Sequence, residues 1–203
     1  YETLANTEAI QKAIKALAER GIEAIVVNNR AEALGKVKSL IPKDASVMNG
    51  SSRTLEEIGF VDYLKSGNHS WKNLHEEILA EADPAKQALL RKQAALSDYY
   101  LGSVHAIAET GQLVIASNSG SQLPHIVFTS QNLIFVVGAQ KLVPNLDAAL
   151  ARVREHVLPL EDKHMRDIGI GGSAISKLLI FEREPVFMGR KVHVIFVNER
   201  LGF

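Results

Sequence analysis

The chain lacks cysteine altogether: none occurs among its 203 residues. This absence excludes disulfide bonds, a cysteine nucleophile, a zinc site built on thiolates and an iron–sulfur cluster held by the chain itself. A protein without cysteine fits a reducing compartment, although it is also compatible with export. We therefore expect a cytoplasmic protein that carries no iron–sulfur cluster of its own.

Two further features are missing: an excess of charge and a long apolar run. Lysine plus arginine number 23, and aspartate plus glutamate also number 23, so the formal net charge is zero. Such a chain has no general attraction to nucleic acid or to an anionic membrane. No apolar run approaches the roughly 20 residues of a membrane helix, and no signal peptide is visible. We expect no nucleic-acid partner and no membrane span.

The N-terminal part of the chain alternates helix and strand patterns. Residues 8–20 place apolar side chains on one helical stripe. Residues 22–29 are rich in isoleucine and valine, which predicts a short buried strand. A second helical pattern over residues 30–41 stops at Pro42, and residues 45–50 predict a second strand. This order is typical of an α/β fold with a largely parallel sheet flanked by helices.

The remaining sequence continues the same pattern. Asp83 and Pro84 are a good helix start, and Asn145 caps an amphipathic helix that Pro159 is expected to end. We further expect a helix from Pro84 to about Leu96, strands over residues 98–104, 112–116 and 132–138, a glycine-rich loop over residues 167–176, and two last strands within residues 177–202. No repeat, linker or low-complexity tract interrupts the chain, so a single domain over residues 1–203 is the simplest interpretation.

Three loops rich in small residues follow apolar strands, over residues 49–54, 117–122 and 137–141. In open α/β sheets, ligands lie beyond the carboxyl ends of the strands, where glycine and serine let backbone N–H groups face an anion. The same residues also make ordinary turns between strands and helices. The candidate ligand-binding residues are Gly50, Ser51, Ser52, Thr110, Gly111, Asn118, Ser119, Gly120 and Lys141. Lys141 would supply positive charge, so we expect a small anionic ligand.

Glu109 is the candidate catalytic residue. It stands between an apolar segment and the Thr110–Gly111 turn, where a carboxylate can act as a base or a nucleophile. Alternatively, it only hydrogen-bonds that turn. If residues 106–111 and 112–117 form a hairpin, Glu109 and Asn118 lie at opposite ends of the strands. The seven histidines have no metal-ligand spacing, so no metal is expected.

Several blocks of this sequence resemble the lactate-utilisation (LUD) domain family. They are "NGSSRTLEEIG", "SVHAIAETGQLVIASNSGSQ", "NLIFVVGAQKLVPNLDAALARV" and the final "VHVIFVNERLGF". The resemblance runs from about Ala9 to Phe203. It implies the fold shared by CoA transferases, ribose-5-phosphate isomerase and glucosamine-6-phosphate deaminase. It also implies a link to bacterial oxidation of L-lactate, beside iron–sulfur partner proteins.

CoA transferases of this fold use a glutamate closely followed by glycine as an acyl acceptor, and "ETG" at Glu109 is similar to that arrangement. The chain also departs from its relatives, which often carry an arginine where Gln122 stands. We expect a component of L-lactate or organic-acid utilisation that acts with iron–sulfur oxidoreductase subunits. The alternatives are a stand-alone enzyme on acyl-CoA or sugar-phosphate substrates, with Glu109 as base or nucleophile, and a non-catalytic metabolite-binding protein. Whether it is an enzyme or a homo-oligomer stays open.

Overall fold

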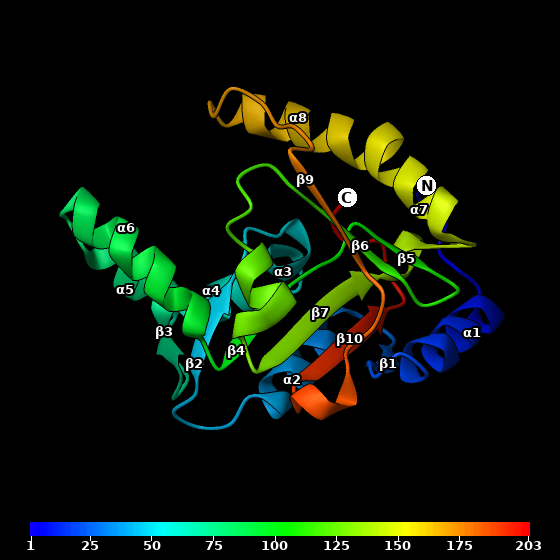
Figure 1. Ribbon diagram of the computed structural model, residues 1–203, viewed down its shortest axis with the longest axis horizontal. Coiled ribbons are helices and arrows are strands. Elements are labelled where there is room, and N and C mark those ends of the chain that lie inside the picture. Colours follow the sequence, from blue (N-terminus) through cyan, green and yellow to red (C-terminus); the bar gives the residue numbers. More distant parts are fainter.

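The central element of the computed structural model, which describes residues 1–203, is a six-stranded parallel sheet (Figure 1). In spatial order its strands are β1 (Glu23–Val27), β10 (Lys191–Val197), β7 (Asn132–Gly138), β4 (Tyr99–Gly102), β2 (Ser46–Asn49) and β3 (Lys72–Asn73). Every pairing in it is parallel, as the strand–helix–strand pattern predicts. The α/β fold with a largely parallel sheet is therefore confirmed.

A second sheet of four short strands lies on one face of the central sheet. Its order is β8 (Leu142–Val143), β5 (Ala106–Ala108), β6 (Leu113–Ser117) and β9 (Lys177–Phe181). β5 and β6 form an antiparallel hairpin, and β9 adds to β6 in the antiparallel direction. This hairpin is the alternative that the sequence left open for residues 106–117.

Eight α-helices connect and cover the sheets. They are α1 (Thr7–Ala18), α2 (Arg30–Leu40), α3 (Arg53–Glu57), α4 (Phe60–Lys65), α5 (Leu74–Ala80), α6 (Pro84–Gln93), α7 (Leu146–Arg152) and α8 (Leu158–Asp167). Short 3₁₀ or π turns span Ala94–Leu96, His125–Thr129, Ala139–Lys141, Val153–Val157 and Val186–Met188. Polar caps start several helices: the side chains of Asn6, Asn29 and Asn145 each accept a backbone N–H three residues ahead. The longest α-helix, α1, has twelve residues, and none of the helices has the length and apolar character that crossing a bilayer requires.

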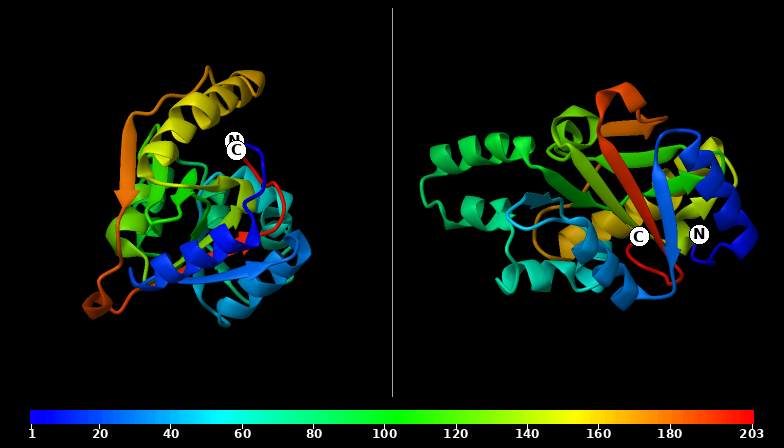
Figure 2. Two further views of the ribbon diagram at one scale, coloured as in Figure 1. Left: turned by 90° about the vertical axis from the view of Figure 1, so that its right-hand side faces the viewer. Right: turned by 90° about the horizontal axis from the view of Figure 1, so that it is seen from below.

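The layers follow from the alternation of side chains along β7. Phe135 and its neighbours on one face pack with α1 and the second sheet, whereas Ile134 and Val136 pack with α2, α3 and α4. The outer face of the second sheet packs on α7 through Val114 and Ala149. The segment from α7 to α8 therefore lies on the opposite side of the molecule from α2 (Figure 2).

Two expectations from the sequence need correction. β1 is an edge strand rather than a buried one: Ile25 and Val26 remain 37% and 43% exposed. Pro159 does not end the helix that Asn145 caps, because a π turn over Val153–Val157 leads directly into α8. Pro159 occupies the first turn of α8, where a missing N–H is tolerated. The helical segment consequently extends past the predicted end to Asp167.

Candidate functional site

One cavity of about 420 Å³ lies where the carboxyl ends of β2, β4 and β7 face the segment from α7 to α8. Small and polar residues form the wall on the side of the sheets, and apolar residues of the helical segment form the opposite wall. The sheet side comprises Gly50–Thr54, Tyr100, Gly102–His105, Ala116–Ser119, Ser121, Gln122, Ile126 and Lys141. The opposite side comprises Val153, Val157, Leu158, Glu161, Met165, Ile170 and Ser173–Ile175, and Gly202 and Phe203 complete the lining.

The parallel register brings the loops of the sheet side together. Asn49 of β2 lies beside Leu101 of β4, so the loop after β2 and the loop after β4 begin at the same edge. β7 pairs with β4 on the other side and runs directly into the turn that carries Lys141. Gly50 belongs at this edge because a Cβ there would collide with the Tyr100 hydroxyl oxygen.

Lys141 is the most unusual side chain of the cavity, since it is only 3% exposed and has no carboxylate within ion-pair distance. Its Nζ donates to Thr54 Oγ1 at 3.1 Å and to Ser103 Oγ at 3.2 Å. Burial, aided by the nearby positive charge of Arg152, lowers the pKa of Lys141 to about 7, against an opposing effect of Glu57. The site therefore holds a buried amine without a partner anion.

Arg152 adds a second buried cation close by. This guanidinium is fully buried, and its Nη1 donates to the carbonyl oxygen of His105. Its Nε and Nη2 have no hydrogen-bond partner. Burial lowers the pKa of Arg152 to about 10, so the group stays charged at neutral pH. Unpaired donors of this kind are costly in a protein interior and favour an anion nearby.

His105 lines the cavity as a neutral hydrogen-bond donor. Its Nδ1 accepts the backbone N–H of Ala116 at 3.1 Å, which places the ring proton on Nε2. Removal from water, together with the charges of Lys141 and Arg152, lowers the pKa of His105 to about 3. The imidazole therefore stays uncharged over the physiological range while its Nε2–H remains available.

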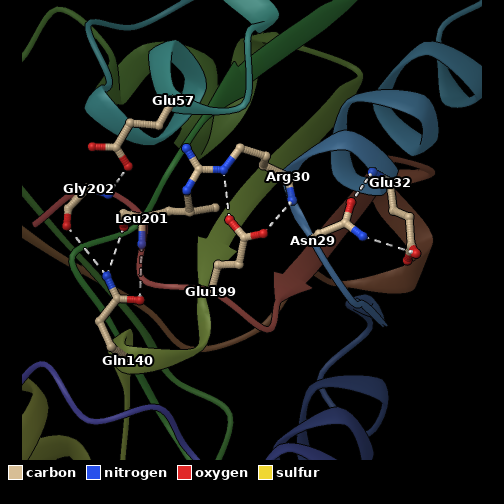
Figure 3. Close-up of polar contacts among 8 residues, drawn as sticks. All are labelled: Asn29, Arg30, Glu32, Glu57, Gln140, Glu199, Leu201 and Gly202. Atoms are coloured by element: carbon tan, nitrogen blue, oxygen red, sulfur yellow. Dashed lines mark hydrogen bonds and ion pairs between the residues drawn. The ribbon is translucent and has the colours of Figure 1, made fainter.

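The segment Leu201–Phe203 contributes Gly202 and Phe203 to the lining of the cavity. Figure 3 shows the contacts of Gln140 and Glu57 with Leu201 and Gly202. Gln140 Nε2 donates to the carbonyl oxygen of Leu201 at 2.9 Å, and the N–H of Gly202 donates to Glu57 Oε2 at 2.8 Å. Gly202 has φ +61°, and a Cβ there would collide with Thr54 Oγ1. This close approach holds the segment against the residues that bind the Lys141 amine.

The structure brings together only part of the predicted site. Gly50, Ser51, Ser52, Asn118, Ser119 and Lys141 line the cavity. Glu109, Thr110, Gly111 and Gly120 do not. Because β5 and β6 are antiparallel, the turn that carries Glu109 lies at one end of the hairpin and Asn118 at the other. The prediction that Glu109 shares one cleft with Ser51 and Lys141 is therefore wrong.

The Glu109 turn instead contacts α1. Glu109 Oε2 lies 2.8 Å from Lys12 Nζ, and the carbonyl oxygen of Thr110 accepts a hydrogen bond from Arg20 Nε at 2.8 Å. Gly111 packs so closely on the end of α1 that a Cβ would come within 2.7 Å of the side chain of Arg20, which follows the helix, and 3.0 Å from the Ala16 backbone. These contacts account for the turn as an anchor between the second sheet and α1.

The cavity also contains three residues that the sequence did not predict for the site: Thr54, Ser103 and His105. Arg152 was not predicted either, and it is buried behind the wall of the cavity. Thr54 is the last residue of the predicted loop over residues 49–54, and Ser103 falls within the predicted strand over residues 98–104. Neither was assigned to the site, although both hydroxyl oxygens accept from the Lys141 amine. His105 and Arg152 gave no usable pattern, because their roles depend on how α7 packs on β5. Gln122 lines the cavity and ties down the end of β6 through Ser117 Oγ and the carbonyl oxygen of Ala116.

The two sheets, their helical cover and a polar cavity at the strand ends define an α/β domain with a ligand-sized site. The family model of the LUD domain matches residues 10–197, so the chain belongs to the LUD domain family, which is linked to lactate utilisation. Its fold is similar to the crystal structure of a DUF162 family protein from Deinococcus radiodurans, with 13% sequence identity and a TM-score of 0.59. That match covers 97% of this chain and 100% of the other. No curated protein matches the chain.

Proposed function

We propose that this LUD-domain protein binds a small carboxylate or phosphate metabolite in the cavity beside Lys141 and serves L-lactate or organic-acid utilisation. The observation that carries the proposal is the presence of two buried cations near each other, Lys141 and Arg152, neither of which has a carboxylate within ion-pair distance. An anion bound beside Lys141 offsets the cost of burying that charge, and Arg152 adds positive potential from behind the cavity wall.

The remaining lining suits a small polar anion rather than a large apolar ligand. Serine residues of the loops after β2 and β6 line the cavity, and His105 supplies a neutral donor. A volume of about 420 Å³ lies in the range of small-molecule sites. Apolar residues such as Val157 and Met165 on the opposite wall exclude water and strengthen the electrostatic attraction.

The role in organic-acid oxidation requires redox partners. The chain has no thiol for an iron–sulfur cluster, and we propose that it acts beside iron–sulfur oxidoreductase subunits. Deletion of the gene in a bacterium that has no second copy should impair growth on L-lactate and leave growth on glucose unchanged. Equal growth of the deletion strain on L-lactate would contradict this role.

Binding is tested by thermal unfolding in the presence of L-lactate, pyruvate, inorganic phosphate, glucose 6-phosphate and coenzyme A, with glycerol and lactamide as neutral controls. A ligand at 100 times its dissociation constant should stabilise the fold by about 2.7 kcal/mol. Lys141→Met should abolish the stabilisation by the effective anion. Equal effects of anions and neutral controls would contradict an anion site.

A stand-alone enzyme with Glu109 as acyl acceptor draws no support from this cavity, because Glu109 lies at the far end of the hairpin. Incubation with acyl-CoA esters followed by mass spectrometry should therefore give no adduct on Glu109. A purely metabolite-binding role predicts the same thermal stabilisation without turnover.

A further inference from the structure

The arrangement of hydrogen bonds around the Lys141 amine is more specific than a general anion site requires. Thr54 Oγ1 donates its own proton to the carbonyl oxygen of Leu201, and Ser103 Oγ donates to that of Val104, both at 3.3 Å. Both hydroxyl oxygens are therefore acceptors toward Lys141. These two hydroxyl oxygens occupy two of the three hydrogen-bonding directions of Lys141 Nζ, and no protein atom hydrogen-bonds along the third.

In the neutral amine these two hydrogen bonds use both N–H groups, so the free position is the lone pair. A buried lysine beside another cation is the setting in which an amine becomes nucleophilic near neutral pH. Lys141 meets this condition, because burial and Arg152 lower its pKa to about 7, while the carboxylate of Glu57 is bound by the N–H of Gly202.

His105 supplies the second group that carbonyl chemistry needs. Its Nδ1 is occupied by the Ala116 N–H, so Nε2–H is a donor that does not titrate near pH 7. A neutral imidazole of this kind can polarise a carbonyl oxygen by donating a hydrogen bond to it. Both His105 and Lys141 line the same cavity.

We infer that Lys141 forms a covalent imine with a small 2-oxo acid, with His105 Nε2–H donating to the carbonyl oxygen. The inference rests on the proposed function, which brings a small carboxylate to this cavity. The lone pair of Nζ attacks the carbonyl carbon, a C–N bond forms and the C–O π bond breaks. The two N–H protons pass to the oxygen, which leaves as water, and a C=N bond remains. No oxidant or reductant is consumed.

Chemical trapping tests the inference. The protein is incubated with pyruvate and sodium cyanoborohydride, which reduces an imine to a stable secondary amine, and is then analysed by intact mass and peptide mapping. We expect one reduced adduct per chain, on Lys141. Lys141→Arg, which keeps the positive charge, should lose it. Lys177→Arg is the matched control. Lys177 is exposed, and its Nζ donates to the carbonyl oxygen of Asn118 at 3.1 Å. Replacement of Lys177 should leave the adduct on Lys141 unchanged.

The pH dependence adds a readout that accidental labelling of surface lysines would not give. The trapping rate should fall about tenfold per pH unit below pH 7, because only the neutral amine reacts. Ordinary lysines, with a pKa near 10.4, would still gain reactivity well above pH 9. An adduct that is spread over several lysines, or that persists in Lys141→Arg, would overturn the inference.

L-lactate separates this inference from the proposed function, because a 2-hydroxy acid has the carboxylate but no carbonyl to form an imine. Thermal stabilisation by both acids without a trapped adduct overturns the imine and leaves the anion site standing. Absence of an adduct, together with absence of stabilisation by every anion of the thermal test, overturns both proposals. An adduct on Lys141 with pyruvate, together with stabilisation by L-lactate, supports both.

Discussion

Glu109 Oε2 lies 2.8 Å from Lys12 Nζ, at the end of the β5–β6 hairpin that points away from the cavity. The ion pair joins the second sheet to α1. Lys12 is 62% exposed at its side chain, and solvent therefore screens the attraction. The carboxylate that the sequence singles out for chemistry thus makes a surface contact between two layers.

The first prediction concerns Glu109→Gln. We expect the free energy of unfolding to fall by no more than about 1 kcal/mol, since exposed ion pairs contribute little. Stabilisation by the effective anion should be unchanged. Urea unfolding and thermal shift measure the two effects, and Lys12→Met is the matched control, with a similar small loss. If Glu109→Gln abolished ligand stabilisation, the site would extend to this turn.

The sequence predicts the central sheet well because its strands are strongly apolar and alternate with amphipathic helices. In such a sheet the loops after parallel strands must meet, so Gly50, Ser51, Ser52 and Lys141 could be grouped from the order of strands and loops alone. The same reasoning fails for Glu109. An apolar strand of three residues, buried on both faces, gives no signal that separates parallel from antiparallel pairing.

The charged residues of the site show a second limit of sequence interpretation. Arg152 lies near Ala149 and Val153 in the helical segment, and the sequence pattern of this helix does not indicate that Arg152 is buried. Only the packing of α7 on β5 buries it and directs Nη1 to the carbonyl oxygen of His105. Likewise, the extension of the helix past Pro159 depends on a π turn, which no residue pattern marks.

The second prediction concerns the close approach of Gly202 to Thr54. Gly202→Ala should weaken ligand binding and lower stability, because the added Cβ would displace the segment next to Lys141. Gly67→Ala is the control: Gly67 has φ +67°, nearly the same as the +61° of Gly202, but no atom lies within 4 Å of the position that its Cβ would take. Both variants carry backbone strain of roughly 1 kcal/mol.

Thermal unfolding of the two glycine variants, with and without the effective anion, separates strain from contact. We expect Gly67→Ala to keep the full ligand-induced shift and Gly202→Ala to lose most of it. Equal ligand-induced shifts in both variants would show that the Leu201–Phe203 segment does not contribute to the site.

The third prediction concerns Arg152→Met. Methionine keeps much of the side-chain volume of arginine and removes the buried charge. Because Nε and Nη2 of Arg152 have no hydrogen-bond partner, the folded state should tolerate this replacement. Anion affinity should fall roughly tenfold, about 1.4 kcal/mol, because one of two nearby cations is lost. Isothermal titration with the effective anion measures this. The pKa of Lys141 should also rise, since Arg152 lowers it, and the imine trapping rate at pH 7 should drop. Unchanged affinity and trapping would remove Arg152 from the site.

The last prediction follows from the lowered pKa of Lys141, about 7 in the folded chain against the ordinary value of 10.5. Below pH 7 the amine is protonated in both states, and the full cost of burying the charge is present. Between pH 7 and pH 10.5 the unfolded chain binds the extra proton, so the free energy of unfolding rises with pH, by up to about 1.4 kcal/mol per unit. Lys141→Met lacks this contribution. The free energy of unfolding of the native chain minus that of Lys141→Met, measured by urea unfolding at pH 6, 7, 8 and 9, should therefore stay constant at first and then increase.

A saturating anion should reduce this pH-dependent rise because it holds Lys141 charged, and the affinity of the anion for the protein should weaken above pH 7. Parallel stability curves for the two proteins would show that Lys141 keeps its ordinary pKa.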